Sequence, residues 1–152
     1  MKPTFVAALL SIFLVACIPP PPARDAVFAN MRASYQTQLQ SSLTAVDSAM
    51  AQFDGALTGL TDQQSNSPRY KSLAGRYDAV VKQYALARSK TQSLLEWAAA
   101  TETTATFEDR NRLQSEAQAL NIELSNLSAT VHQLPAEINV IQMTVVEQRA
   151  AR

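Results

Sequence analysis

Apolar side chains recur at helical spacing through the first half of the chain. Between residues 27 and 60, successive apolar positions lie three or four residues apart, which places them along one face of an α-helix. These positions are Phe28, Met31, Tyr35, Leu39, Leu43, Val46, Met50, Phe53, Leu57 and Leu60. The pattern predicts an amphipathic helix that ends near Gly59, because glycine suits a left-handed C-terminal cap.

Two further stretches show the same period. The second begins at Pro68, which follows Ser67 as a first helical residue follows its N-cap, and extends to about residue 101. Its seam comprises Tyr70, Leu73, Tyr77, Val80, Tyr84, Ala87, Thr91, Leu94 and Ala98. The third opens near Thr106 and Asp109, which form a loose capping box. Its seam comprises Leu113, Ala117, Leu120, Leu124, Leu127, Val131, Leu134, Ile138, Ile141 and Val145. We therefore expect three long helices.

Pro135 interrupts the third stretch without shifting its phase. A proline inside a helix removes one backbone hydrogen bond, so a kink is expected there. The unbroken phase favours a kinked continuation of the helix. Residues 138–146 are nevertheless rich in strand-forming side chains, which leaves a strand over residues 136–148 as the alternative.

These patterns predict an all-α fold, in which residues 26–152 form an antiparallel three-helix, coiled-coil-like bundle. The second helix is predominantly basic and its neighbours are acidic, so their rims are complementary. The third helix is the longest, and its last turns should extend past the end remote from the N-terminus. Ile141, Met143, Val145 and Val146 would then form an exposed apolar site for a partner protein. Heptads this regular could also mediate self-association.

Composition excludes several functions. The chain carries 13 basic and 13 acidic residues, which argues against a nucleic-acid surface. No nucleophile–base pair, phosphate-binding loop or metal-ligand cluster is recognisable, so we expect no enzyme, no metal site and no cofactor. The single histidine, His132, lies beside the seam, and we expect it to be an ordinary exposed residue.

The N-terminus has the pattern of an export signal. Lys2 precedes a mostly apolar run over residues 5–16, which is too short to cross a bilayer, and the run ends at the only cysteine, Cys17. The motif Leu14-Val15-Ala16-Cys17 resembles the lipobox of bacterial lipoproteins. This resemblance implies a signal peptide over residues 1–16, cleavage before Cys17, and covalent lipid on the Cys17 sulfur. Residues 17–25 would then be the lipidated cysteine and a proline-rich tether.

The resemblance also implies a location. Ile18 follows Cys17, in place of the Asp that retains enteric lipoproteins in the inner membrane, so we expect the outer membrane, facing the periplasm. The expected function is that of a non-catalytic structural or assembly factor in an envelope complex of secretion, conjugation or pilus type.

The alternative function is a periplasmic binding module, which would act as a chaperone, an inhibitor or a sensor of an anionic envelope component. Residues 60–64, Leu-Thr-Asp-Gln-Gln, are similar to the Leu-Thr-x-x-Gln motif of Spy-like periplasmic chaperones. Thr61 and Gln64 are equally well placed to form a capping box. Trp97, near the end of the second helix closest to the tether, could contact lipid headgroups or cap the end of the bundle.

Overall fold

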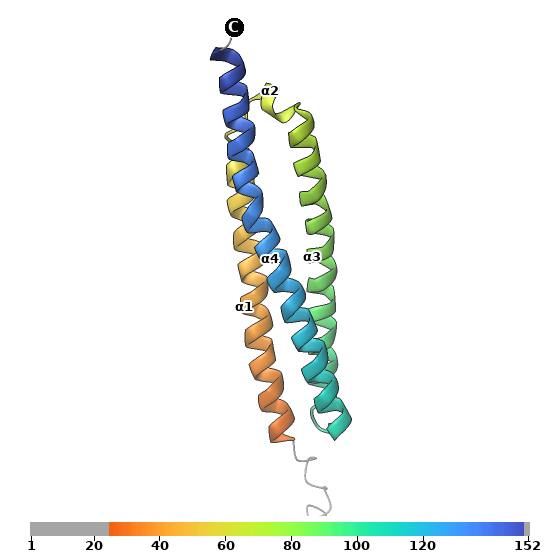
Figure 1. Cartoon of the computed structure of the whole chain (residues 1–152). Coiled ribbons are helices and arrows are strands. Elements are labelled where there is room, and N and C mark those ends of the chain that lie inside the picture. Colours follow the sequence, from red (N-terminus) through yellow and green to blue (C-terminus); the bar gives the residue numbers. More distant parts are fainter. Residues whose placement is uncertain (1–24, 151–152) are drawn as a thin grey trace, which may run out of the picture.

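The computed structural model describes residues 25–150, and the side chains of residues 25–143. This part of the chain forms four helices and no strand: α1 (Ala26–Leu57), α2 (Asp62–Ser65), α3 (Pro68–Thr101) and α4 (Phe107–Ala150). The three long helices lie lengthwise beside one another, and the short α2 lies at the end opposite the start of α1 (Figure 1). The all-α prediction is confirmed for the described residues.

The predicted apolar seams form the core. α4 packs along both α1 and α3, whereas α1 and α3 contact each other over fewer residues. The fully buried side chains include Phe28, Leu39, Val46, Phe53, Leu73, Ala87, Ala98, Leu113, Leu124 and Val131. Burying a large apolar side chain completely contributes about 1.5–3 kcal/mol, so this seam is the main source of stability.

Two ion pairs fix which helix ends meet. Arg110 on the first turn of α4 pairs with Asp25, which immediately precedes α1. Near the other end, Arg76 on α3 pairs with Glu137 on the second half of α4. The start of α4 therefore lies against the start of α1, and the first turns of α3 lie against the later turns of α4.

Side-chain caps set most helix boundaries. Ser67 caps α3 by accepting a hydrogen bond from the backbone N–H of Tyr70 at 3.2 Å, as the sequence predicts. Thr106 and Asp109 form the expected reciprocal box: the Thr106 N–H donates to Asp109 at 2.8 Å, and the Asp109 N–H donates to the Thr106 hydroxyl at 3.2 Å. The Gln64 side chain likewise accepts from the Thr61 N–H at 2.8 Å, which opens α2. The capping interpretation of this motif is confirmed.

Of two local predictions, one is wrong and one is confirmed. The left-handed cap at Gly59 does not occur, because no described glycine has a positive φ. α1 instead ends at Leu57, and the Thr58 hydroxyl donates to the carbonyl of Gly55 at 2.7 Å. The favoured helical continuation over residues 136–148 is confirmed, and the strand alternative is excluded, because α4 continues through Pro135 as one helix of 44 residues. Seam packing on both neighbouring helices outweighs the local strand preference there.

Candidate functional site

The residues of the predicted partner-binding segment differ in exposure. Met143 is 64% exposed, as expected, but Ile141 is only 1% exposed and belongs to the core. The expectation that Ile141 is exposed is therefore wrong. Ile141 belongs to the same buried cluster as the rest of the seam, and the short α2 also packs against α4. The side chains of Val145 and Val146 lie outside the described residues, as do Cys17 and the tether.

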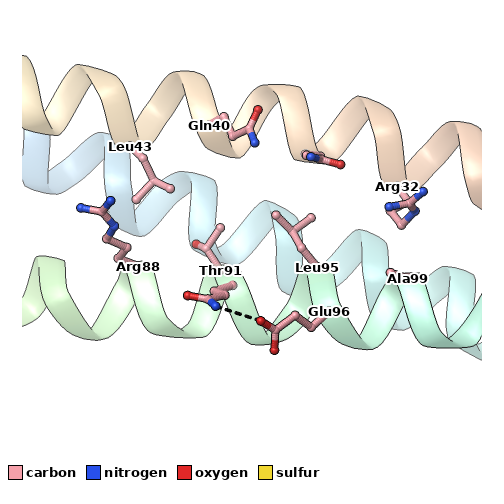
Figure 2. Close-up of a pocket in the computed structure, with 10 residues that line it drawn as sticks. Arg32, Gln40, Leu43, Arg88, Thr91, Leu95, Glu96 and Ala99 are labelled. Carbon is pink, nitrogen blue, oxygen red and sulfur yellow. Dashed lines mark hydrogen bonds between the residues drawn. The ribbon is translucent and has the colours of Figure 1, made fainter.

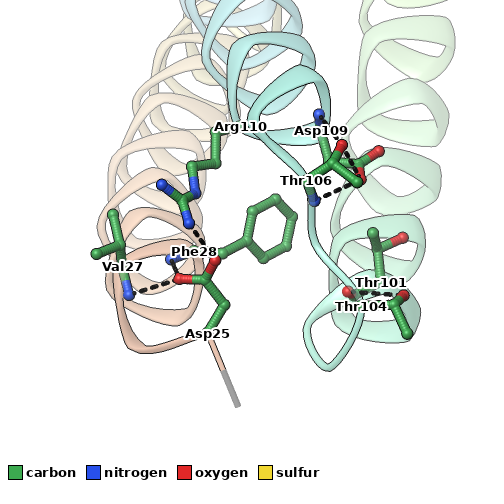
Figure 3. A network of polar contacts seen from close by, with 8 residues as sticks. All are labelled: Asp25, Val27, Phe28, Thr101, Thr104, Thr106, Asp109 and Arg110. Atoms are coloured by element: carbon green, nitrogen blue, oxygen red, sulfur yellow. Dashed lines mark hydrogen bonds and ion pairs between the residues drawn. The ribbon is translucent and has the colours of Figure 1, made fainter. Parts of the chain in front are cut away.

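A polar network joins the helix ends at the start of α1 (Figure 3). One carboxylate oxygen of Asp25 accepts hydrogen bonds from the N–H groups of Val27 at 3.0 Å and Phe28 at 3.1 Å, while the other binds Arg110. The Phe28 hydrogen bond and then the Arg110 guanidinium lower the pKa of Asp25 below its usual value. Asp25 is therefore both the N-cap of α1 and a clamp on α4.

A second ion pair supports the same end. Glu102, at the C-terminal end of α3, is 7% exposed and pairs with Arg32 of α1 at 2.8 Å. The backbone N–H of Asp25 also donates to the Glu102 carbonyl at 3.3 Å. Because a buried carboxylate is costly without a partner, Arg32 and Glu102 hold α1 and α3 in a defined relative position.

Trp97 is partly buried and packs against the core at this end of the molecule. Its ring meets Phe28 edge-to-face with centroids 6.2 Å apart, and the Arg112 guanidinium lies 4.2 Å from the ring centroid. An aromatic edge contact and a cation–π contact both favour this position. These contacts fit the role of a bundle-end cap that the sequence allowed for Trp97.

The polar side chains of α3 contact α4 and α1 in two different ways. Between α3 and α4 it consists of ion pairs, Arg76 with Glu137 and Lys90 with Glu123 at 3.3 Å, as the charge pattern predicts. The acidic residues of α1 instead bind tyrosine. The Tyr84 hydroxyl donates to Asp47 at 2.6 Å and the Tyr77 hydroxyl donates to Asp54 at 2.9 Å. Burial, followed by these hydrogen bonds to carboxylates, raises the pKa of each tyrosine to about 12.

A groove of about 360 Å³ lies between α1 and α3 (Figure 2). Arg32 and Arg88 line its two ends, and Gln40 and Leu95 lie between them on opposite walls. A further glutamine on the α3 wall, Gln92, donates to Glu96 at 2.8 Å. The lining combines amides, charges and a few apolar groups, so it suits a polar ligand or a partner segment. It contains no nucleophile–base arrangement.

The remaining candidates are His132, a metal-ligand cluster and a membrane-spanning helix. His132 is exposed, as expected, and its Nδ1 lies 2.8 Å from the Ser128 carbonyl one turn earlier. Across residues 25–150, no three His, Cys, Asp or Glu side chains gather in a way that could hold a metal ion. None of the helices in this range is both long enough and apolar enough to cross a bilayer.

Sequence reasoning missed the clamp at the start of α1. Asp25 directly precedes an apolar helical stretch, which is the usual position of an N-cap, and that signal could have identified it. Its pairing with Arg110 joins residues 85 positions apart and has no local signature. No protein-family model matches the chain, and neither a curated protein nor a solved structure is significantly similar to it.

Proposed function

We propose that this protein is a bacterial lipoprotein, anchored to the outer membrane through lipid on Cys17 and facing the periplasm. In this proposal it acts as a non-catalytic structural or assembly factor of an envelope complex. The observation that carries the proposal is the sequence Leu14-Val15-Ala16-Cys17 at the end of a short apolar run. Two or more acyl chains on one cysteine would anchor the protein stably.

The folded part of the chain supports a scaffolding role. We propose that α1, α3 and α4 act together as an antiparallel three-helix, coiled-coil-like bundle, with a kink in α4 at Pro135. At 1.5 Å per residue, the 34 residues of α3 extend about 50 Å. A rod of this length, with a continuous apolar core and ion pairs near both ends, would hold its far end at a fixed distance from the bilayer.

The far end is the proposed site of contact with a protein partner. Met143 presents an exposed thioether side chain on α4, which extends at least ten residues more than α1 or α3. Val145 and Val146 follow on the same helix, and a partner could take this segment as a helix in a groove. Because Ile141 is part of the core, the docking segment of this proposal begins after it.

A second candidate function is a periplasmic binding module. It is favoured by the groove between α1 and α3, where Arg32, Arg88 and glutamine amides surround an open volume. Arg88 gives the groove a cation that could meet an anionic glycan or peptide. In this case the protein would retain a small or extended ligand and would not form a complex of fixed composition.

Chemical crosslinking in intact cells, followed by purification from detergent extracts, separates the two candidates. An assembly factor should be recovered with a partner in constant ratio. Removal of residues 142–152 should abolish recovery of that partner but should leave the core of α4 intact through Ile141. Met143→Ser should weaken recovery, and Ile122→Ser provides a control because Ile122 is 61% exposed at mid-rod. Full recovery of the partner by the truncated protein would contradict the docking proposal. Recovery of glycan or mixed clients alone would favour the binding module.

A further inference from the structure

We propose that the end of the rod from which the tether emerges is itself a membrane-contact surface, through which Val27 and Phe107 enter the interfacial region of a zwitterionic bilayer. We call these two residues the basal apolar pair. The inference rests on the proposed lipid anchor and adds a defined orientation of the rod: it stands with this end against the lipid headgroups.

Exposure and position single out the basal apolar pair. Phe107 is 72% exposed and Val27 is 54% exposed, although both are large apolar side chains. Phe107 is the first residue of α4 and Val27 is the second residue of α1. The ion pair between Asp25 and Arg110 holds these two helix starts together at one end of the molecule (Figures 1 and 3).

Helix geometry directs both side chains toward that end. In an α-helix every Cα–Cβ bond tilts toward the helix N-terminus. Because α1 and α4 both begin here, this tilt inclines the Cα–Cβ bonds of Val27 and Phe107 toward the end of the rod from which the tether emerges. Phe107 also lies three residues before Arg110, about one turn closer to that end of α4.

The surroundings of the pair suit a zwitterionic lipid surface. The turn between α3 and α4 exposes the hydroxyl-bearing residues Thr103, Thr104 and Thr106. The nearby arginines are engaged within the protein: Arg110 with Asp25, Arg32 with Glu102, and Arg112 with Glu116 and the Trp97 ring. Glu108, beside Phe107, is exposed. This end therefore offers apolar and hydroxyl groups but no cluster of free cations that would select anionic lipids.

The position of Cys17 in the sequence indicates that a bilayer is what this end of the rod would contact. Cys17 lies eight residues before Asp25, and a polyproline-like segment of that length spans about 25 Å. A lipid on Cys17 would therefore keep the bilayer within reach of the end that carries Val27 and Phe107. The mid-rod residues Ile122 and Leu86, 61% and 56% exposed, lie on the helical sides, so they have no such neighbour when the rod stands on its end.

Tryptophan fluorescence in vesicles tests the proposal. The full lipidated protein, purified from cell envelopes, would carry Trp97→Phe together with either Phe107→Trp or Ile122→Trp, so that each variant has one indole. In phosphatidylcholine vesicles with brominated acyl chains, we expect the Phe107→Trp probe to lose about half of its emission relative to unbrominated vesicles, since interfacial groups reach about 5–10 Å into the boundary. The Ile122→Trp probe should be unaffected, and added salt should change neither result.

A second measurement leaves Trp97 in place, in case its replacement disturbs packing against Phe28. Vesicles should protect the turn between α3 and α4 from protease in the wild type and in Ile122→Ser, but Phe107→Ser should lose most of that protection. Three results would overturn the membrane-contact surface. They are equal quenching of both probes, no quenching in a protein that floats with the vesicles, and a response that appears without lipid and grows with protein concentration. The last outcome would identify a second copy as the occupant.

Different results would refute the lipid anchor and the membrane-contact surface. A protein that lacks acyl mass on Cys17 and does not float with vesicles would remove the lipoprotein proposal, and this surface with it. A protein that carries the acyl chains and floats, yet shows no contact at Phe107, would remove only the surface.

Discussion

Replacing Leu124 by Ala tests the packing of α4 against its neighbours. Leu124 is fully buried, whereas Ile122, two residues earlier on the same helix, is 61% exposed. The substitution removes three carbon atoms from the core, and at about 0.8 kcal/mol for each buried carbon this costs about 2.4 kcal/mol. A residual cavity adds to the loss, and buried leucines replaced by alanine cost about 2–5 kcal/mol in total.

The structure narrows that range for Leu124. A surface hollow of about 300 Å³ lies beside Leu124, with Ser42 and Ala45 of α1 on its other wall. Neighbouring side chains can move and water can enter from this hollow, so the remaining cavity should be small. We therefore expect the free energy of unfolding to fall by about 3 kcal/mol, toward the lower half of the usual range.

Urea and thermal unfolding followed by the helical circular dichroism signal would measure this effect. Leu124→Ala should lower the melting temperature by about 9 °C, at about 3 °C for each kcal/mol in a domain of this size. Ile122→Ala is the matched control, and its free energy of unfolding should change by less than about 0.5 kcal/mol. Equal losses from both variants, or a larger loss from Ile122→Ala, would show that the face of α4 assigned to the core is wrong.

Three further predictions concern caps and pH. The pKa of Asp25 is lowered in the folded state. Its contribution to folding stability is therefore complete above the unfolded pKa of about 3.9, and it is lost as the pH falls through the folded pKa. Asp25→Asn should make the free energy of unfolding less dependent on pH on the acid side. Burial and the hydrogen bond to Asp47 raise the pKa of Tyr84 to about 12, so its contribution is complete below about pH 10 and is lost as the pH rises through about 12. Tyr84→Phe should lose less stability than the wild type over this alkaline range, and an identical decline would contradict the assignment. Ser67→Ala should lower the free energy of unfolding by about 1 kcal/mol in urea, whereas Ser67→Gly should cost only a few tenths.

The core could be predicted from sequence because its signal is periodic and repeated. Each apolar seam follows from spacings of three and four residues, and even Thr91, a polar residue at a seam position, is 2% exposed. Its hydroxyl donates to the Ala87 carbonyl at 2.9 Å, so the position tolerates a hydroxyl group. The starts of α2, α3 and α4 were also predictable, since each cap joins a backbone N–H to a side chain only three residues away.

Features that depend on distant residues were not predictable in the same way. Ile141 lies at a seam position, but the pattern within α4 does not show how far along that helix the other helices cover the seam. Gly59 has the local context of a left-handed cap, yet the chain turns there without a positive φ. Phe107 lies off the seam, so the periodicity did not single it out. Its place beside the start of α1 follows only from the contact between Arg110 and Asp25.

The mass of the N-terminal peptide from the exported protein is the most direct test of the central claim. The account predicts that the peptide begins at Cys17 and carries a diacylglyceryl group on its sulfur together with an acylated amino terminus. It also predicts that Cys17→Ser leaves the signal peptide uncleaved and the helical content of the domain unchanged. A peptide that begins at Cys17 with a free, unmodified thiol, or one that begins after Cys17, would contradict the account.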